Sequence, residues 1–91
     1  MIDRERVRHA AENSPFTSIQ RASDVLSMLR MLELKDYNGI YSKIVRRYAV
    51  SNQVIPDVIR DIASLKDEKE KELNIIHFIT FCTEIKNKED K

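Results

Sequence analysis

The sequence predicts an all-α fold, a small bundle of four to five helices that forms a single domain over residues 1–91. Only Gly39, Pro15 and Pro56 interrupt the chain, whereas sheet proteins need many tight turns, which draw on glycine and proline. Apolar residues recur at three- and four-residue intervals along most of the sequence, which is typical of amphipathic helices. A chain of 91 residues has room for one hydrophobic core. We therefore expect a few long helices joined by short polar connections.

The first third of the chain is expected to form two helices. Residues 2–13 predict a weakly amphipathic helix that Asp3 caps. A stronger helix then runs to about Lys35. It begins either at Ser14-Pro15, with the proline at the first helical position, or at Thr17, which opens a capping box. Its predicted inner face carries apolar residues at helical spacing, namely Ile19, Ala22, Leu26 and Leu29, with Val25, Met28 and Leu32 beside them.

The middle of the chain is expected to hold two shorter helices. Residues 36–39 predict a turn in which Gly39 takes the left-handed conformation that ends a helix. A short helix follows over about residues 40–48, and a further one reaches about Leu65. The residues expected to hold these helices to the core are Ile40, Tyr41, Ile44, Val45 and Tyr48 in the first, and Ile55, Val58, Ile59, Ile62 and Leu65 in the second.

The last helix is expected to start at a capping box of Asp67 and Glu70 and to end near Lys86, before a frayed tail over residues 87–91. Its middle, Leu73–Cys82, is rich in β-branched and aromatic residues, so a strand is the alternative there. As a helix, this segment has apolar residues around most of its circumference. That pattern predicts either a central helix or a helix buried in a homodimer.

The sequence carries none of the common motifs of catalysis or metal binding. His9, His77 and Cys82 lack the spacing of metal ligands. Cys82 has no neighbouring cation or glycine-rich turn to activate its thiol, and a single glycine cannot build a phosphate-binding loop. We therefore predict no enzyme activity, no metal and no cofactor.

Composition also limits where the protein works. No apolar run approaches the roughly 18 residues of a membrane span, and the charged N-terminal residues do not resemble a secretion signal. Cys82 is the single cysteine, which rules out an internal disulfide and favours a reducing compartment. The sequence thus predicts a cytoplasmic protein without a membrane partner.

Charge is unevenly distributed, although the formal net charge is only +1. Residues 1–60 hold ten Lys and Arg against seven Asp and Glu, whereas residues 61–91 hold six against eight. All eight arginines lie in the first part, and the planar guanidinium group suits phosphate and carboxylate. The arginines indicate either an anionic partner or solvated helix faces.

One segment carries a more specific pattern. Residues 41–60 read Tyr-Ser-Lys-Ile-Val-Arg-Arg-Tyr-Ala-Val-Ser-Asn-Gln-Val-Ile-Pro-Asp-Val-Ile-Arg. This resembles the helix-turn-helix of bacterial regulators, whose common form runs hydrophobic-Ala-x-x-hydrophobic-Gly-Val-Ser-x-x-x-Val-x-x-hydrophobic. Residues 18–29 resemble the opening helix of winged repressors of the isocitrate-lyase-regulator type, so the likeness covers roughly residues 18–65. No wing follows, because a charged helix is expected from Asp67.

The resemblance implies a DNA-binding transcriptional regulator that acts as a homodimer, with the last helix as its dimer contact. Val50 would fill the turn and Ser51 would cap the second helix of the motif. Base-edge contacts would fall to Asn52, Gln53 and Arg60, and phosphate contacts to Lys43, Arg46, Arg47 and Ser51.

Three residues depart from the pattern. Val45 stands in place of the alanine, and Ala49 in place of the glycine. Pro56 matters most, because a helix that starts after Ser51 would lose a backbone hydrogen bond there, at about 3 kcal/mol. If Pro56 instead begins the helix, the turn is too long for a helix-turn-helix, and an ordinary helical bundle results.

The alternative function is a protein-binding helical bundle, such as a bacteriocin immunity protein, an antitoxin or a phage-encoded inhibitor. Those groups share the size and mixed charge of this chain and its lack of catalytic motifs. Aromatic side chains are common anchors of such interfaces, and the candidates here are Tyr37, Tyr41, Tyr48 and Phe81.

Overall fold

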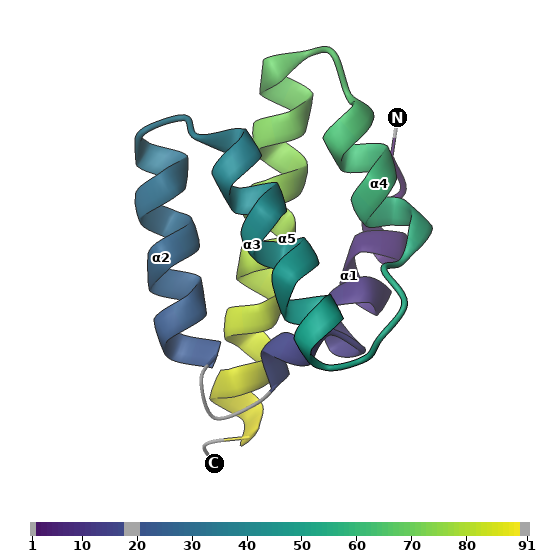
Figure 1. The fold of residues 1–91 in the computed structure, drawn as a ribbon, viewed down its shortest axis with the longest axis vertical. Helices are drawn as coiled ribbons and strands as arrows, with labels where there is room; N and C mark the ends of the chain where they lie inside the picture. Colours follow the sequence, from purple (N-terminus) through teal and green to yellow (C-terminus); the bar gives the residue numbers. More distant parts are fainter. Residues whose placement is uncertain (1, 18–20, 90–91) are drawn as a thin grey trace.

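A computed structural model describes residues 2–17 and 21–89, with the side chains of residues 17, 21, 22 and 85–89 left out of the description. Within these residues the chain is all-helical and holds no strand, which confirms the predicted fold class. Residues Leu73–Cys82 are helical. The elements in chain order are α1 (Arg4–Glu12), the 3₁₀ turn η1 (Pro15–Thr17), α2 (Arg21–Glu33), α3 (Tyr37–Val50), α4 (Asp57–Ser64) and α5 (Glu68–Glu89) (Figure 1).

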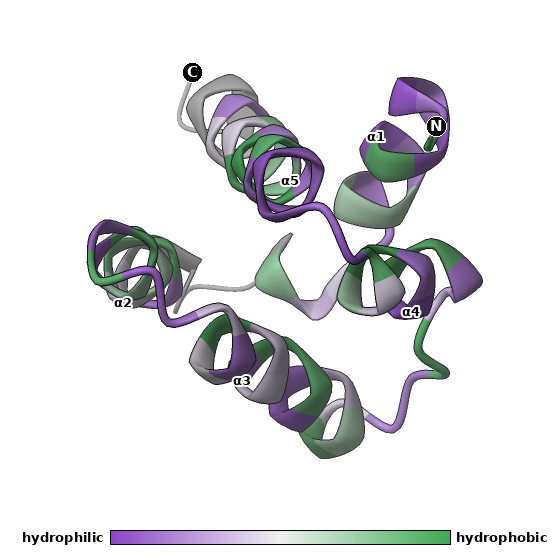
Figure 2. Cartoon of the chain, turned by 90° about the horizontal axis from the view of Figure 1, so that it is seen from above, coloured by the Kyte–Doolittle hydropathy of each residue, from purple (hydrophilic) through white to green (hydrophobic). Residues whose placement is uncertain are grey.

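Helix α5 is the longest element, and the others are arranged around it and around η1. It packs most extensively against α1 and then α2, while α3 packs mainly against α2 and α4 against α1 and α5. Seen from above, the helices surround η1 in the order α1, α4, α3, α2 and α5 (Figure 2). Helices α3 and α4 are neighbours in this arrangement, but each packs mainly against other helices, α3 against α2 and α4 against α1 and α5.

The core forms where η1 meets α5. Phe16 of η1 and Phe78 of α5 are both buried, with ring centroids 5.9 Å apart in an edge-to-face arrangement, a favourable geometry for aromatic pairs. Ser14 holds η1 in place, because its Oγ accepts a hydrogen bond from the Phe16 N–H and donates one to the Ala11 carbonyl. The other core residues are Val7, Ala10, Ala11, Val25, Met28, Ile40, Ile44, Tyr48, Val58, Ile59, Ile62, Ile75, Ile79, Phe81 and Cys82.

Aspartates start three of the helices. Asp3 accepts a hydrogen bond from the Glu5 N–H, and Asp67 accepts one from the Lys69 N–H, which confirms two predicted N-terminal caps. Asp36 caps α3 by accepting the Gly39 N–H at 3.0 Å. Such caps satisfy N–H groups that have no partner inside the helix.

The turn predicted at residues 36–39 is wrong, because α3 already begins at Tyr37. Gly39 lies in the first turn of this helix and has no positive φ. The left-handed residue that follows α2 is Lys35, with φ of 57°. Helix α3 also continues to Val50, past the expected end at residue 48, and α5 continues to Glu89, so residues 87–89 are helical and not a frayed tail.

The predicted inner face of α2 needs correction. Val25 and Met28 are buried, as expected, but Leu26 is 64% and Leu29 is 40% exposed. Asp24 of the same helix is buried instead, where it faces the cations Lys43 and Arg47 of α3. Ile19 and Ala22, also predicted for this face, lie outside the residues whose side chains the structure describes.

Candidate functional site

The connection between α3 and α4 is not the tight turn of a helix-turn-helix. Helix α3 ends at Val50 with Ser51 as its C-cap, and α4 begins at Asp57 with Pro56 as its N-cap residue. The predicted capping of the second helix by Ser51 is therefore wrong, and Val50, expected to fill the turn, is 72% exposed. This arrangement keeps Pro56 out of a helix interior, where it would cost about 3 kcal/mol.

The residues predicted to read bases do not lie together on one helix. Asn52 and Gln53 close the end of α3, because the Gln53 N–H donates to the Tyr48 carbonyl at 2.9 Å and Asn52 has φ of 58°. This is the Schellman arrangement, for which asparagine is the usual substitute for glycine. Arg60 lies separately on α4. All three side chains are exposed, but the structure does not bring them to one helix N-terminus.

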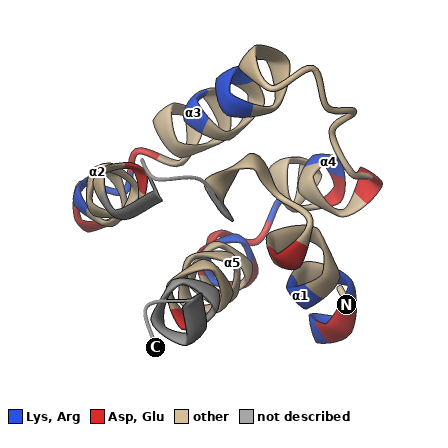
Figure 3. Ribbon diagram, turned by 90° about the horizontal axis from the view of Figure 1, so that it is seen from below, with Lys and Arg blue, Asp and Glu red and all other residues tan. Residues whose placement is uncertain are grey.

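Two of the predicted phosphate contacts face a carboxylate within the protein. Lys43 Nζ lies 3.3 Å and Arg47 Nη2 lies 3.0 Å from Oδ1 of Asp24, whose side chain is 2% exposed. Helix α3 carries basic residues and no acidic ones (Figure 3), so the acid of α2 offsets one of its charges. Arg46 and Ser51 remain exposed.

Several other arginines are also engaged by the fold. The guanidinium groups of Arg4 and Arg8 lie 5.6 and 4.9 Å from the centroid of the Phe81 ring, within cation–π range. Arg6 of α1 pairs with Asp61 of α4 at 2.9 Å. The arginine bias of the sequence thus reflects, in part, contacts among helices of the bundle.

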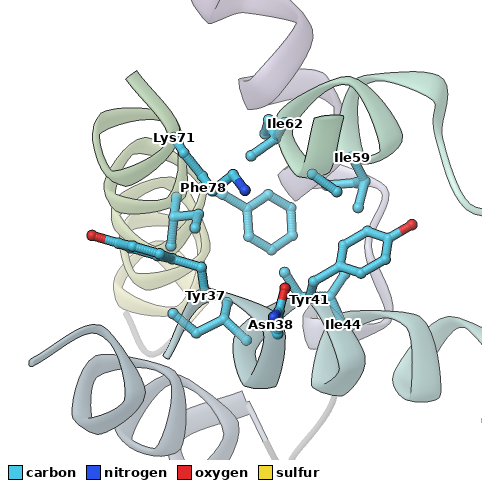
Figure 4. Close-up of a pocket in the computed structure, with 11 residues that line it drawn as sticks. Tyr37, Asn38, Tyr41, Ile44, Ile59, Ile62, Lys71 and Phe78 are labelled. Carbon is cyan, nitrogen blue, oxygen red and sulfur yellow. The ribbon is translucent and has the colours of Figure 1, made fainter. Parts of the chain in front are cut away.

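An apolar cleft opens between α3 and α4, with α5 as its floor. It encloses a cavity of about 240 Å³. The connection between the two helices spans residues 51–56, and α3 and α4 are not among the helix pairs that pack extensively. The lining residues come from three helices (Figure 4): Tyr37, Asn38, Ile40, Tyr41 and Ile44 of α3, Ile59, Ile62 and Ala63 of α4, and Lys71, Ile75 and Phe78 of α5.

Two tyrosines form the α3 wall of this cleft. Tyr37 and Tyr41 are one helical turn apart and half-buried, and both hydroxyl groups point away from the cavity centre, so their rings face it (Figure 4). Desolvation, and then the charges of Glu72 and Glu68, raise the pKa of the Tyr37 hydroxyl. Of the four aromatic anchors suggested by the sequence, these two reach the cleft, whereas Tyr48 and Phe81 are buried in the core.

Lys71 is the one charged residue among the described residues that line the cavity. Its side chain is half-buried and points across the cavity toward α4 (Figure 4). It forms no salt bridge with any residue in the described part of the chain. Lys71 could not be singled out from the sequence, because it stands in the charged run 66–72, where each neighbour looks equally solvated.

Comparisons of the chain with protein-family models, with curated proteins and with solved structures find no match. Among the described residues, no group of three or more His, Cys, Asp and Glu side chains could hold a metal ion. No helix within the described ranges is long and apolar enough to cross a membrane.

Proposed function

We propose that this protein is a non-enzymatic module that binds a partner protein through the cleft between α3, α4 and α5. The observation that carries the proposal is the cavity of about 240 Å³, which is lined mainly by aliphatic and aromatic side chains and which the described part of the chain leaves unfilled. Small-molecule sites usually enclose roughly 300–1,000 Å³, whereas a cavity of about 150 Å³ already holds benzene. The size therefore suits one or two bulky side chains of a partner.

The rim of the cleft supports the same function. Tyr37 and Tyr41 present large ring faces at little cost in conformational entropy, and tyrosine is enriched among residues that dominate binding energy. Ile59 and Ile62 stand opposite on α4 and are almost fully buried, so this wall is formed by the fold itself. A preformed apolar wall reduces the entropy lost on binding.

DNA binding, which the sequence resemblance implies, stays a prediction. It relies on Arg46 and Arg60. These two predicted contacts are charged and form no salt bridge with an acidic residue in the described part of the chain. The geometry favours a protein partner, because Lys43 and Arg47 are paired with Asp24 and the motif's tight turn is absent. A homodimer through α5 likewise stays a prediction.

A substitution that fills the cleft tests the proposed function. Ala63 lines the cavity, so Ala63→Leu occupies part of its space without removing a core contact. Ala49→Leu is the matched control, because Ala49 is an exposed helical alanine of α3 that does not line the cavity. The wild-type protein and both variants are immobilised and exposed to lysate of the native organism, and stoichiometric bound proteins are identified by mass spectrometry.

We expect one protein to be retained by the wild type and by Ala49→Leu and to be lost from Ala63→Leu. A partner retained equally by all three would place the interface elsewhere and overturn the proposal. Retention of nucleic acid by all three, without a stoichiometric protein, would favour DNA binding instead.

A further inference from the structure

The apolar walls of the cleft explain an apolar anchor but not the presence of a lysine. Lys71 occupies a half-buried position at the cavity, which Ile62 and Phe78 also line. Half-buried cations elsewhere in this fold have an acid beside them, as Lys43 and Arg47 have Asp24. Lys71 has no such partner among the described residues.

The acids nearest in sequence form no salt bridge with Lys71 among the described residues, although Glu68 lies one helical turn before it on the same face of α5. Glu68 and Glu72 stand close enough to the Tyr37 hydroxyl to raise its pKa, together with desolvation, and that hydroxyl points away from the cavity (Figure 4). Lys71 points the opposite way, across the cavity toward α4 (Figure 4). The mouth of the cleft therefore offers one ammonium group and no lining carboxylate.

We propose that the partner segment bound by this cleft is an amphipathic helix that carries a bulky apolar anchor and, one helical turn away, an acidic residue that pairs with Lys71. The inference rests on the proposed function. Residues three or four apart on a helix lie on the same face, roughly 5–6 Å from each other. The anchor fills the space above Phe78 while the carboxylate meets the ammonium group at the mouth.

The charge pair contributes chiefly to specificity. Once the partner covers the mouth, water is excluded around Lys71, and an ammonium group left without a counter-charge there is strongly unfavourable. A helix with a basic residue at the same position would bring two like charges together. The cleft is thus expected to reject basic helices as well as to accept acidic ones.

The experiment uses a display library of helical peptides in which one face carries a fixed Leu or Phe anchor and the positions three and four residues before and after it are randomised. Selections are run in parallel on the wild type, Lys71→Glu, Lys71→Met and Lys69→Glu, and the selected pools are sequenced. Lys69→Glu is the matched control, because it makes the same charge change on α5 at an exposed residue outside the cavity lining. Circular dichroism confirms that each variant is folded.

We expect Asp and Glu to be enriched at least fivefold at one randomised position on the wild type and on Lys69→Glu. The preference should vanish on Lys71→Met and change to Lys and Arg on Lys71→Glu. Each selected peptide is also measured on Ala63→Leu. Peptides that need the open cleft but show no acidic preference would overturn this inference and leave the proposed function standing. Peptides that bind Ala63→Leu equally well would instead contradict the proposed function.

Discussion

The carboxylate of Asp24 on α2 accepts a 3.0 Å hydrogen bond from the guanidinium group of Arg47 on α3 while its own side chain is 2% exposed. Lys43, one turn earlier on α3, approaches the same oxygen at 3.3 Å. Oδ2 of Asp24 has no hydrogen-bond partner within the described part of the chain. The burial of Asp24 thus depends on cations that reach it from the neighbouring helix.

Removing both cations should destabilise the fold more than neutralising the acid. In Lys43→Met with Arg47→Met, Asp24 remains a buried carboxylate without counter-charge, and we expect a loss of about 3 kcal/mol in the free energy of unfolding. In Asp24→Asn the two cations, which are 24% and 30% exposed, turn toward solvent, and a loss of about 1 kcal/mol is expected. Urea unfolding measures both values. Arg46→Met, an exposed neighbour, serves as the control, and the reverse order of effects would contradict the role assigned to Asp24.

The same pairing leads to a prediction about nucleic acid. Because Asp24 offsets part of the charge on α3, we expect the wild-type protein to bind mixed-sequence duplex DNA no more tightly than a neutral control protein does at about 50 mM salt. Fluorescence anisotropy with a labelled duplex measures this. Affinity that falls steeply with salt, with a slope reduced by Arg46→Ala together with Arg60→Ala, would revive the DNA-binding prediction.

The helices were predictable because each carries its own signal in nearby residues. These signals act within a few residues. They are the helix-interrupting prolines Pro15 and Pro56, the caps at Asp3 and Asp67, and the apolar spacing in α3, α4 and α5. Gly39 shows the limit of such signals. The same Asp-Tyr-Asn-Gly sequence suits either a turn or a capped helix start, and the structure takes the capped start.

The candidate site was less predictable, because it depends on which helices are neighbours in space. Ile44 is a core residue, as its spacing predicted, but the same spacing did not show that Tyr41 would be half-buried beside it at a cleft that α4 and α5 complete. Nothing near Asp24 in the sequence shows that Lys43 and Arg47 will reach it. Pro56 did indicate the long connection between α3 and α4, since a proline inside a helix is costly.

The start of α3 allows a test of coupling between a cap and a glycine. A Cβ atom at Gly39 would overlap the Asp36 carboxylate that caps the helix. Gly39→Ala should therefore change stability little, because about 1 kcal/mol gained in helix propensity offsets about 1 kcal/mol lost from the cap. In the Asp36→Ala background, the same change should stabilise the protein by about 1 kcal/mol. Thermal unfolding of the four proteins measures the coupling, and equal effects in both backgrounds would show that the cap survives.

Tyr48 offers the last test, because its hydroxyl is buried among the core helices without a hydrogen-bond partner in the described residues. Tyr48→Phe should raise the free energy of unfolding by about 1 kcal/mol near neutral pH, since it removes an unsatisfied polar group. Burial, and to a lesser extent Cys82, raise the pKa of Tyr48 to about 12. Below pH 10 the hydroxyl keeps its proton in both the folded and the unfolded chain, so this group gives no pH dependence.

Above pH 10 the unfolded chain loses the proton of Tyr48 first, and the wild type should lose about 1.4 kcal/mol of stability per pH unit up to about 12. Tyr48→Phe lacks that loss. The difference in the free energy of unfolding between the two proteins should therefore grow by about 1.4 kcal/mol between pH 9 and pH 11, as measured by urea unfolding. Tyr41→Phe is the control, because Tyr41 is half-buried at the cleft and not enclosed in the core. A difference in the free energy of unfolding that stays constant with pH would mean that the Tyr48 hydroxyl contacts water or a hydrogen-bond partner in the folded protein. The hydroxyl would then not be enclosed in the core.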